Sequence, residues 1–179
     1  MSTPSIPTGI WNVDPTHSRV GFVARHMMVT KVRGQFSDYT ADVMIGDDPL
    51  DSKVSVTVQM ASVDTGNADR DGHLRTNDFF DIDTYPTMTF ESTRFVADGD
   101  DYKMIGDLTV KGVTREVEFD VEFEGLGTDP WGGTRAGFEA KAVIDRTDFG
   151  VEFNAALETG GVLLGDKVTI ELDIQLVKA

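Results

Sequence analysis

Residues 14–38 read DPTHSRVGFVARHMMVTKVRGQFSD, and this stretch decides the fold class. Val20 and Phe22 begin an alternation of apolar and other side chains, which is the period of a β-strand with one buried face. His26 shares their parity, whereas His17 has the opposite parity, because residues nine apart on an unbroken strand point to opposite sides. We therefore do not expect the two histidines to form a pair.

The same period of two continues along most of the chain and predicts about eight strands. The parity of the apolar residues changes after residues 37–38, which is how a β-bulge shows itself in a sequence. One segment breaks the pattern and predicts a short helix over residues 68–78, with Asn67 as its N-cap. We expect a flexible N-terminal lead over residues 1–9 and a single domain over residues 10–179, which the regularly spaced strands predict to be an antiparallel barrel or sandwich.

Composition excludes several classes of function. The 179 residues carry a net charge of −15, which argues against a nucleic-acid partner because phosphates need a basic surface. The absence of cysteine removes disulfides, thiol nucleophiles and thiolate metal sites. The first residues show no signal peptide, and the apolar runs are too short to span a bilayer, so we expect a cytoplasmic protein.

The size of the inward residues indicates whether the barrel is hollow. Ala24, Gly34 and Ala41 are inward by parity, and three of the five inward residues on the stretch 134–145 are alanine. A core packed to native density needs larger side chains, so small ones leave room for a guest or fit tight corners of a coiled sheet. The presumed walls are apolar and favour a long hydrocarbon, since each buried methylene contributes roughly 0.8 kcal/mol.

Four segments together resemble one known family. They read DPTHSRVGFVARHMMVTKVRGQF, RDGHLRTNDFFDIDTYPTMTFES, GDLTVKGVTREVEFDVEFEG and IDRTDFGV, and the similarity runs from about Trp11 to Leu176. The chain is similar to the YceI-like family of polyisoprenoid-binding proteins. The resemblance implies an all-β, eight-stranded antiparallel lipocalin-like barrel with one short helix. It also implies a long apolar tunnel for polyprenyl phosphates, isoprenoid quinones or related amphiphiles. Some relatives form dimers, and many are exported with a signal peptide that is not seen here.

These observations predict non-catalytic binding, storage or transport of a long-chain isoprenoid, with no cofactor and no metal. The residues expected to bind the ligand are His17, Val20, Phe22, Ala24, His26, Val32, Gly34, Phe36, Val56, Val58, Arg75, Phe79, Phe80, Met88, Phe90, Met104, Leu108, Phe138, Ala140 and Ala142. Two alternatives stay open. One is an enzyme acting on an isoprenoid lipid with His17 or His26 as acid–base, and the other is a solid barrel whose partner is another protein.

Several polar and aromatic residues have two interpretations. His17 and His26 could meet a head group or cap loop carbonyls at strand ends. His73 could contact an anion or form a surface pair with Asp69 or Asp71, and the role of Arg75 is left open. Phe79 and Phe80 could be a lid over a lipid or a plug in a core. The three histidines show no metal-ligand spacing, and no nucleophile elbow, P-loop or HExxH motif is present.

Overall fold

The computed structural model describes residues 6–27, 29–154 and 164–179. Strands make up most of this part of the chain, and a single α-helix lies between the sixth and seventh strands. The elements are β1 (Gly9–Val13), β2 (Arg19–His26), β3 (Thr30–Phe36), β4 (Tyr39–Ile45), η1 (Pro49–Asp51), β5 (Lys53–Gln59), η2 (Met60–Ser62), β6 (Val63–Asp64), α1 (Ala68–Leu74), β7 (Thr87–Asp98), β8 (Asp101–Val110), β9 (Val113–Thr128), β10 (Thr134–Asp145), η3 (Arg146–Phe149) and β11 (Leu164–Lys178), where η marks a short 3₁₀ helix.

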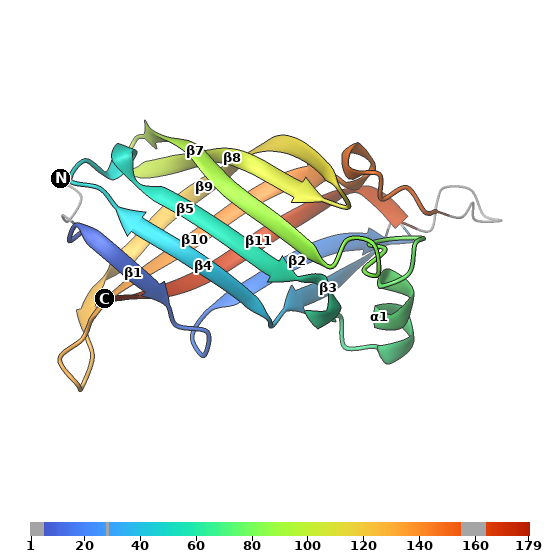
Figure 1. The fold of residues 1–179 in the computed structure, drawn as a ribbon, viewed down its shortest axis with the longest axis horizontal. Helices are drawn as coiled ribbons and strands as arrows, with labels where there is room; N and C mark the ends of the chain where they lie inside the picture. The colour runs from blue at the N-terminus through green and yellow to red at the C-terminus, as the bar shows by residue number, and fades with distance from the viewer. Residues whose placement is uncertain (1–5, 28, 155–163) are drawn as a thin grey trace.

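The sheet closes on itself. Neighbouring strands follow the order β1-β4-β5-β7-β8-β9-β10-β11, and β11 pairs again with β1. Every one of these pairings is antiparallel, so the expected eight-stranded barrel is confirmed. Figure 1 shows the strands running obliquely around a long barrel, with both termini at one end and α1 at the other.

Three further strands lengthen one wall of the barrel. β2 pairs with the first part of β11, β3 pairs with β2, and β6 pairs with β3. The parity change at residues 37–38 is therefore not a bulge within one strand, as the sequence indicated. Phe36 ends β3 beside β2, and Tyr39 begins β4, which pairs with β1 and β5. The two residues between them form a break at which the chain changes partners.

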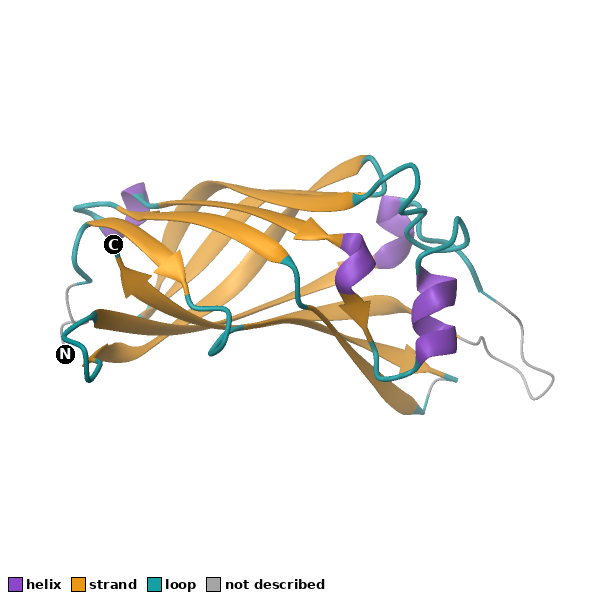
Figure 2. Cartoon of the chain, turned by 60° about the horizontal axis from the view of Figure 1, so that its bottom comes forward, coloured by secondary structure: helices purple, strands orange, loops and turns teal. Residues whose placement is uncertain are grey.

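The helix is shorter than predicted. The side chain of Asn67 accepts a hydrogen bond from Arg70 N at 3.0 Å, which confirms the N-cap. The α-helix ends at Leu74 rather than at residue 78, because turns follow, in which Phe80 N donates to Leu74 O. Figure 2 shows that most helical segments gather at this end of the barrel.

A buried tryptophan on β1 lies beside the C-terminal residues of β11, toward the end of the barrel that carries both termini (Figure 1). The side chain of Trp11 is 1% exposed, and its Nε1 donates to Pro7 O at 2.9 Å. Ile6 belongs to the same cluster and is 9% exposed, although it falls within the lead expected over residues 1–9. Residues 1–5 of that lead lie outside the described residues. The packed domain therefore includes Ile6.

We expect Gly106→Ala to destabilise the barrel by about 2 kcal/mol, because inserting atoms into a packed core forces the backbone to shift. A Cβ at Gly106 on β8 would lie 2.3 Å from the carbonyl oxygen of Glu91 and 2.5 Å from the Phe90 ring. Urea unfolding followed by circular dichroism measures the change. Gly127→Ala is the matched control, since a Cβ there meets nothing within 4 Å. Equal stability of the two variants would contradict this account.

Candidate functional site

The barrel encloses an apolar cavity of about 520 Å³ that runs from the terminal end to the α1 end. Cavities of this size are typical of small-molecule sites. Inward side chains of the strands form its walls, so the interior is not packed solid. Most of the residues predicted from the sequence to bind a ligand line it, namely Val20, Phe22, Ala24, His26, Val32, Phe36, Val56, Val58, Phe79, Phe80, Met88, Phe90, Met104, Leu108, Phe138 and Ala140.

Four predicted residues lie away from this lining. Gly34 makes room for a neighbouring ring, because a Cβ there would lie 2.3 Å from Cζ of Phe22. Ala142 is buried in the core cluster around Phe119. Arg75 donates to Ala61 O at 3.2 and 3.1 Å and thereby holds η2 against the turns that follow α1. Small size and basic charge thus have structural explanations at these positions.

His17, the fourth of these residues, belongs to the corner between β1 and β2. Its Nδ1 lies 2.7 Å from Oδ2 of Asp14, and Arg135 Nη1 donates to the same oxygen at 2.7 Å. The His17 side chain is 64% exposed. These bonds, together with that of Thr16 N to Oδ1, keep the pKa of the Asp14 carboxyl well below its usual range. This cluster joins the corner to β10 and explains His17 without a ligand.

Asp14→Asn is expected to change how stability depends on pH. Because the pKa of Asp14 is lower in the folded chain than in the unfolded chain, its contribution is complete above the ordinary value of 3.8 and is lost as the pH falls below it. The wild type should therefore lose its advantage over the variant in acid. Urea midpoints measured from neutral pH to well below 3.8 test this. Asp42→Asn is the control, because Asp42 is an exposed residue of β4. A stability difference between the wild type and Asp14→Asn that does not change with pH would contradict the prediction.

The polar residues of the lining concentrate at the α1 end. Arg70 and His73 on α1 are the only exposed residues among those of the described chain that line the cavity. His26, which pairs across to Leu164, is half-buried, and Arg146 in η3 is buried. At the other end the lining residues Ile6, Ile45 and Ser52 are buried and Pro49 is half-buried, so none of these four is exposed. The cavity therefore reaches solvent beside α1.

His73 takes a different partner from the two that the sequence suggested. Its Nε2 lies 2.7 Å from Oδ2 of Asp78 rather than near Asp69 or Asp71, because the chain turns back after the short helix. The imidazole also packs edge-on against the rings of Phe79 and Phe153, with centroids 5.0 and 4.9 Å apart. His73 thus joins an aromatic group that borders the opening.

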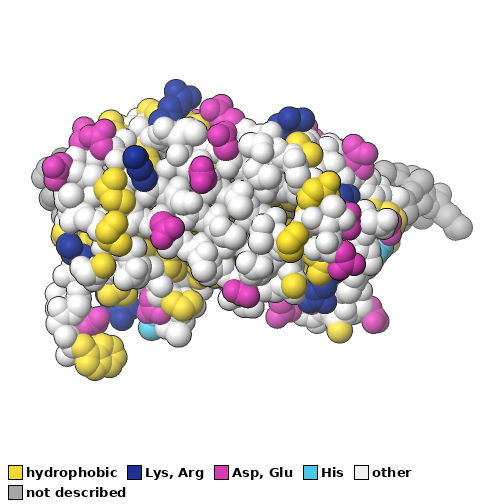
Figure 3. Space-filling view, in the orientation of Figure 1, with side chains coloured by type: hydrophobic (Ala, Val, Ile, Leu, Met, Phe, Trp, Pro, Cys, Tyr) yellow, Lys and Arg dark blue, Asp and Glu magenta, His cyan; other side chains and the backbone are white. Residues whose placement is uncertain are grey.

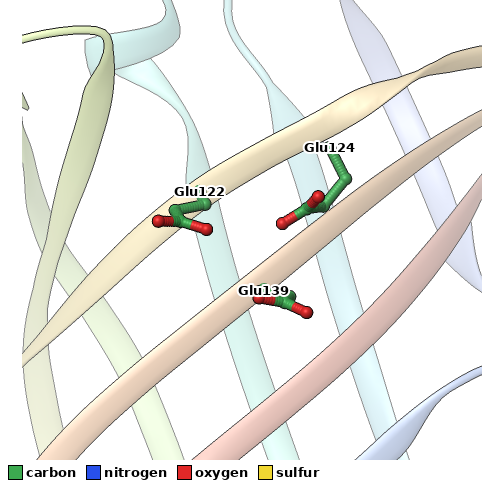
Figure 4. A group of neighbouring side chains, drawn as sticks. All are labelled: Glu122, Glu124 and Glu139. Atoms are coloured by element: carbon green, nitrogen blue, oxygen red, sulfur yellow. The ribbon is translucent and has the colours of Figure 1, made fainter.

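Charge is distributed differently inside and outside the barrel. The chain has 31 Asp and Glu residues, yet none of them is among the described residues that line the cavity. Figure 3 shows acidic side chains scattered over the outer surface between basic and apolar ones. One acidic group, Glu122, Glu124 and Glu139, lies on the outside of β9 and β10, where repulsion from Glu124 and Asp173 raises the pKa of Glu139 (Figure 4). All three are exposed, and they are separate from the cavity.

Comparison with known proteins identifies the family. Residues 11–176 match the YceI-like domain. The chain belongs to the YceI-like family. A UPF0312 protein of Staphylococcus epidermidis is 41% identical over 165 residues, which cover 90% of this chain and 93% of the relative.

Two solved structures are similar to this YceI-like barrel. BcnA of Burkholderia cenocepacia has a TM-score of 0.80 at 26% identity, with 92% of this chain and 99% of BcnA covered. A polyisoprenoid binding domain from Saccharophagus degradans has a TM-score of 0.69 at 18% identity, with 94% and 98% covered, and this likeness shows the fold alone. No helix in the described part of the YceI-like chain is long and apolar enough to cross a membrane.

Apart from His26, the polar residues of the YceI-like cavity were not among those predicted from the sequence to bind a ligand. The hydroxyl of Tyr39 and Nη2 of Arg146 are buried lining groups that make no hydrogen bond within the described residues. Arg146 lies inside the segment IDRTDFGV between Asp145 and Thr147, and these polar neighbours gave no signal that its guanidinium is held inside the fold. Arg70 and His73 were visible in the sequence, but their place at an opening depends on how α1 packs across the barrel end.

Proposed function

We propose that this YceI-like barrel binds a long-chain isoprenoid lipid in its cavity, as a carrier or store that does not change the lipid chemically. The observation that carries the proposal is the cavity of about 520 Å³ along the barrel, whose walls are formed by Val, Phe, Met, Leu, Ile and Ala side chains. A hydrocarbon chain gains transfer free energy there without specific polar contacts, at roughly 0.8 kcal/mol for each buried methylene.

The family and the wall chemistry support this class of ligand. The domain from Saccharophagus degradans, which shares the fold, is a polyisoprenoid binding domain. A sugar or a nucleotide would leave many polar groups unpaired against such walls, and that is costly. Polyprenyl phosphates and isoprenoid quinones are the candidates that combine a long apolar tail with a polar head. The cytoplasmic location and the dimer expected from the sequence stay predictions.

Lipid extraction tests the proposal. The protein is purified from the cells that produce it and extracted with organic solvent, and the extract is analysed by mass spectrometry. We expect an isoprenoid in amounts approaching one molecule per chain, and binding of added geranylgeraniol by protein from which lipid has been removed. Binding of a maltoside detergent would show that the cavity accepts any apolar chain. Competition between the detergent and geranylgeraniol is therefore measured. Absence of both an extracted lipid and prenol binding would refute the proposal.

A further inference from the structure

The hairpin formed by β2 and β3 has no acidic residue, although the chain as a whole is strongly acidic. Residues 15–37, which include the hairpin, contain no Asp or Glu, whereas the chain has 31 of them among 179 residues. Basic residues lie in the same stretch, namely Arg19, Arg25, Lys31 and Arg33. The hairpin is therefore a local basic region on a chain whose net charge is −15.

The two faces of the hairpin differ in chemistry. Ala24, His26 and Val32 line the cavity, so the residues that alternate with them point to the outside of the barrel. Arg25 and Lys31 are opposite each other on this outer face, and both are exposed. Among the described residues, neither side chain forms an ion pair. These two cations are therefore available to an anionic partner.

Other charges near this face leave the positive charge in excess. Arg33 lies two residues further along β3, where its Nη1 is 3.5 Å from Oε2 of Glu171. On β11 the register with β2 shifts between Leu164 and Val168, and this irregular stretch carries Asp166 and Lys167. The charges of those two residues offset each other. Arg25 and Lys31 thus determine the sign of the charge beside the hairpin tip.

The tip of the hairpin is apolar and exposed. Met27 is 46% exposed and Val29 is 75% exposed. The turn that carries them is closed by the N–H of Val29, which donates to His26 O at 3.2 Å. Exposed apolar side chains with charged residues around them are typical of surfaces that bind a protein or a membrane.

The tip lies beside the opening of the cavity. Figure 1 shows β2 ending and β3 beginning at the α1 end of the barrel. His26, the last residue of β2, lines the cavity and pairs with Leu164 on β11. A surface that contacts the tip therefore lies next to the place where the cavity reaches solvent.

From this arrangement we infer that the β2–β3 hairpin docks the protein on a membrane surface that contains anionic lipids. Met27 and Val29 enter the boundary between head groups and acyl chains. Arg25 and Lys31 are each two strand residues behind, which is about 7 Å, and this matches the depth of the head-group layer. The docking itself does not depend on the proposed function, whereas its use in loading the cavity with lipid rests on that function.

The net negative charge of the chain does not oppose this contact strongly. At physiological ionic strength, exposed charges further than about 8 Å from the membrane are largely screened. Asp71 on α1 binds Thr65, which directly follows β6, and β6 pairs with β3 at Gln35 and Phe36. That pairing is about 20 Å along β3 from the tip. The local charge of the hairpin therefore governs docking.

Vesicle binding by protein freed of lipid tests the docking surface. Sedimentation with vesicles of phosphatidylcholine alone is compared with sedimentation with vesicles of phosphatidylcholine and phosphatidylglycerol in equal amounts. Each basic side chain near an anionic surface contributes about fivefold in affinity, which is about 1 kcal/mol. From the two unpaired cations we expect roughly thirtyfold tighter binding to the mixed vesicles, and added salt should reduce this preference.

Hairpin variants assign the binding to these residues. Arg25→Gln combined with Lys31→Gln should weaken binding to the mixed vesicles roughly thirtyfold, because both contacts with anionic head groups are lost. Val29→Ser should weaken it by about tenfold, since an apolar side chain no longer enters the membrane. Neither change touches the cavity lining, so both variants should bind geranylgeraniol in solution like the wild type. Circular dichroism checks that they are folded.

Residues on other walls of the barrel provide matched controls. Lys53 on β5 and Lys141 on β10 are exposed, so Lys53→Gln combined with Lys141→Gln removes the same charge away from the hairpin. Val143 on β10 is 66% exposed, and Val143→Ser matches the apolar change at the tip. These variants should bind the mixed vesicles like the wild type.

A fluorescent probe reports which end of the barrel meets the membrane. The chain has no cysteine, so Val29→Cys and Ile10→Cys can each be labelled at a single position with an environment-sensitive dye. Ile10 is 56% exposed on β1, close to the termini. The dye at position 29 should shift to the emission of an apolar environment on mixing with anionic vesicles, and the dye at position 10 should not.

Several results would overturn the docking surface. They are equal binding to the two kinds of vesicle, equal binding by the wild type and the folded hairpin variants, or a probe response at position 10 in place of 29. A DNA oligonucleotide offers no apolar layer to the tip and should bind at least about tenfold more weakly than the mixed vesicles. Equally tight DNA binding would show recognition of polyanions in general and refute membrane docking. Vesicle binding without geranylgeraniol binding would remove the proposed function and leave the docking surface standing.

Discussion

An Ala41→Trp variant is expected to lose affinity for geranylgeraniol by tenfold or more while it keeps its fold. Ala41 on β4 lines the cavity and is not fully buried by neighbouring side chains. An indole at this position would occupy space that the tail needs. Displacing only two methylenes costs about 1.6 kcal/mol, which is already roughly tenfold in the dissociation constant. Titration of lipid-free protein measures the loss, and circular dichroism shows whether the barrel survives.

The neighbouring residue provides the control for this variant. Thr40 is exposed on the outer face of the same strand, so Thr40→Trp adds the same side chain outside the barrel. It should bind geranylgeraniol like the wild type. If Ala41→Trp is folded and also binds normally, the ligand does not occupy this cavity and the carrier proposal is wrong. If both variants lose binding, the tryptophan acts through stability rather than through occupied volume.

The strands and their inward faces could be predicted because the alternation of apolar and polar residues is local and repeats along the chain. Alternation along the strands assigns each side chain to the wall or the outside, and the assignment holds for residues as far apart as Phe22 and Ala140. The strand pattern alone is compatible with a barrel or a sandwich, and the expectation of a closed barrel comes from the resemblance to the YceI-like family. The predicted lining was wrong where the size of a residue is set by contact with a neighbouring side chain. Gly34 is small because the Phe22 ring lies against it, and this depends on a pairing between β2 and β3 that parity alone does not give.

The polar end of the cavity could not be predicted for a related reason. Arg146 and His73 are far apart in the sequence, yet both contact Phe153, whose carbonyl accepts from Arg146 and whose ring packs against His73. The histidines and arginines of residues 14–38 lie close to one another in the sequence, and His17 was therefore predicted to bind the ligand. In the structure His17 binds Asp14 at an outer corner, whereas His26 from the same segment lines the cavity. Charge close together along a strand thus said little about charge close together in space.

Trp11→Ala is expected to destabilise the protein by about 3 to 5 kcal/mol, the range for removing a large buried aromatic side chain. Trp11 is 1% exposed and lies on β1, which pairs with both β4 and β11 and so closes the barrel. Its removal leaves a hole beside Ala136 and Leu176 and frees the carbonyl of Pro7. Urea unfolding followed by far-ultraviolet circular dichroism measures the change.

Two further variants separate the contributions at this closing strand. Trp11→Phe keeps most of the ring but loses the hydrogen bond from Nε1 to Pro7 O, so it should cost less than Trp11→Ala by about 2 kcal/mol. Trp131 is 85% exposed, and Trp131→Ala should change stability by no more than about 0.5 kcal/mol. A small effect of Trp11→Ala, comparable to that of Trp131→Ala, would mean that the pairing of β1 with β4 and β11 holds the barrel closed without this side chain. Because the backbone pairing of β1 involves only a few residues on each side, we expect the tryptophan to dominate.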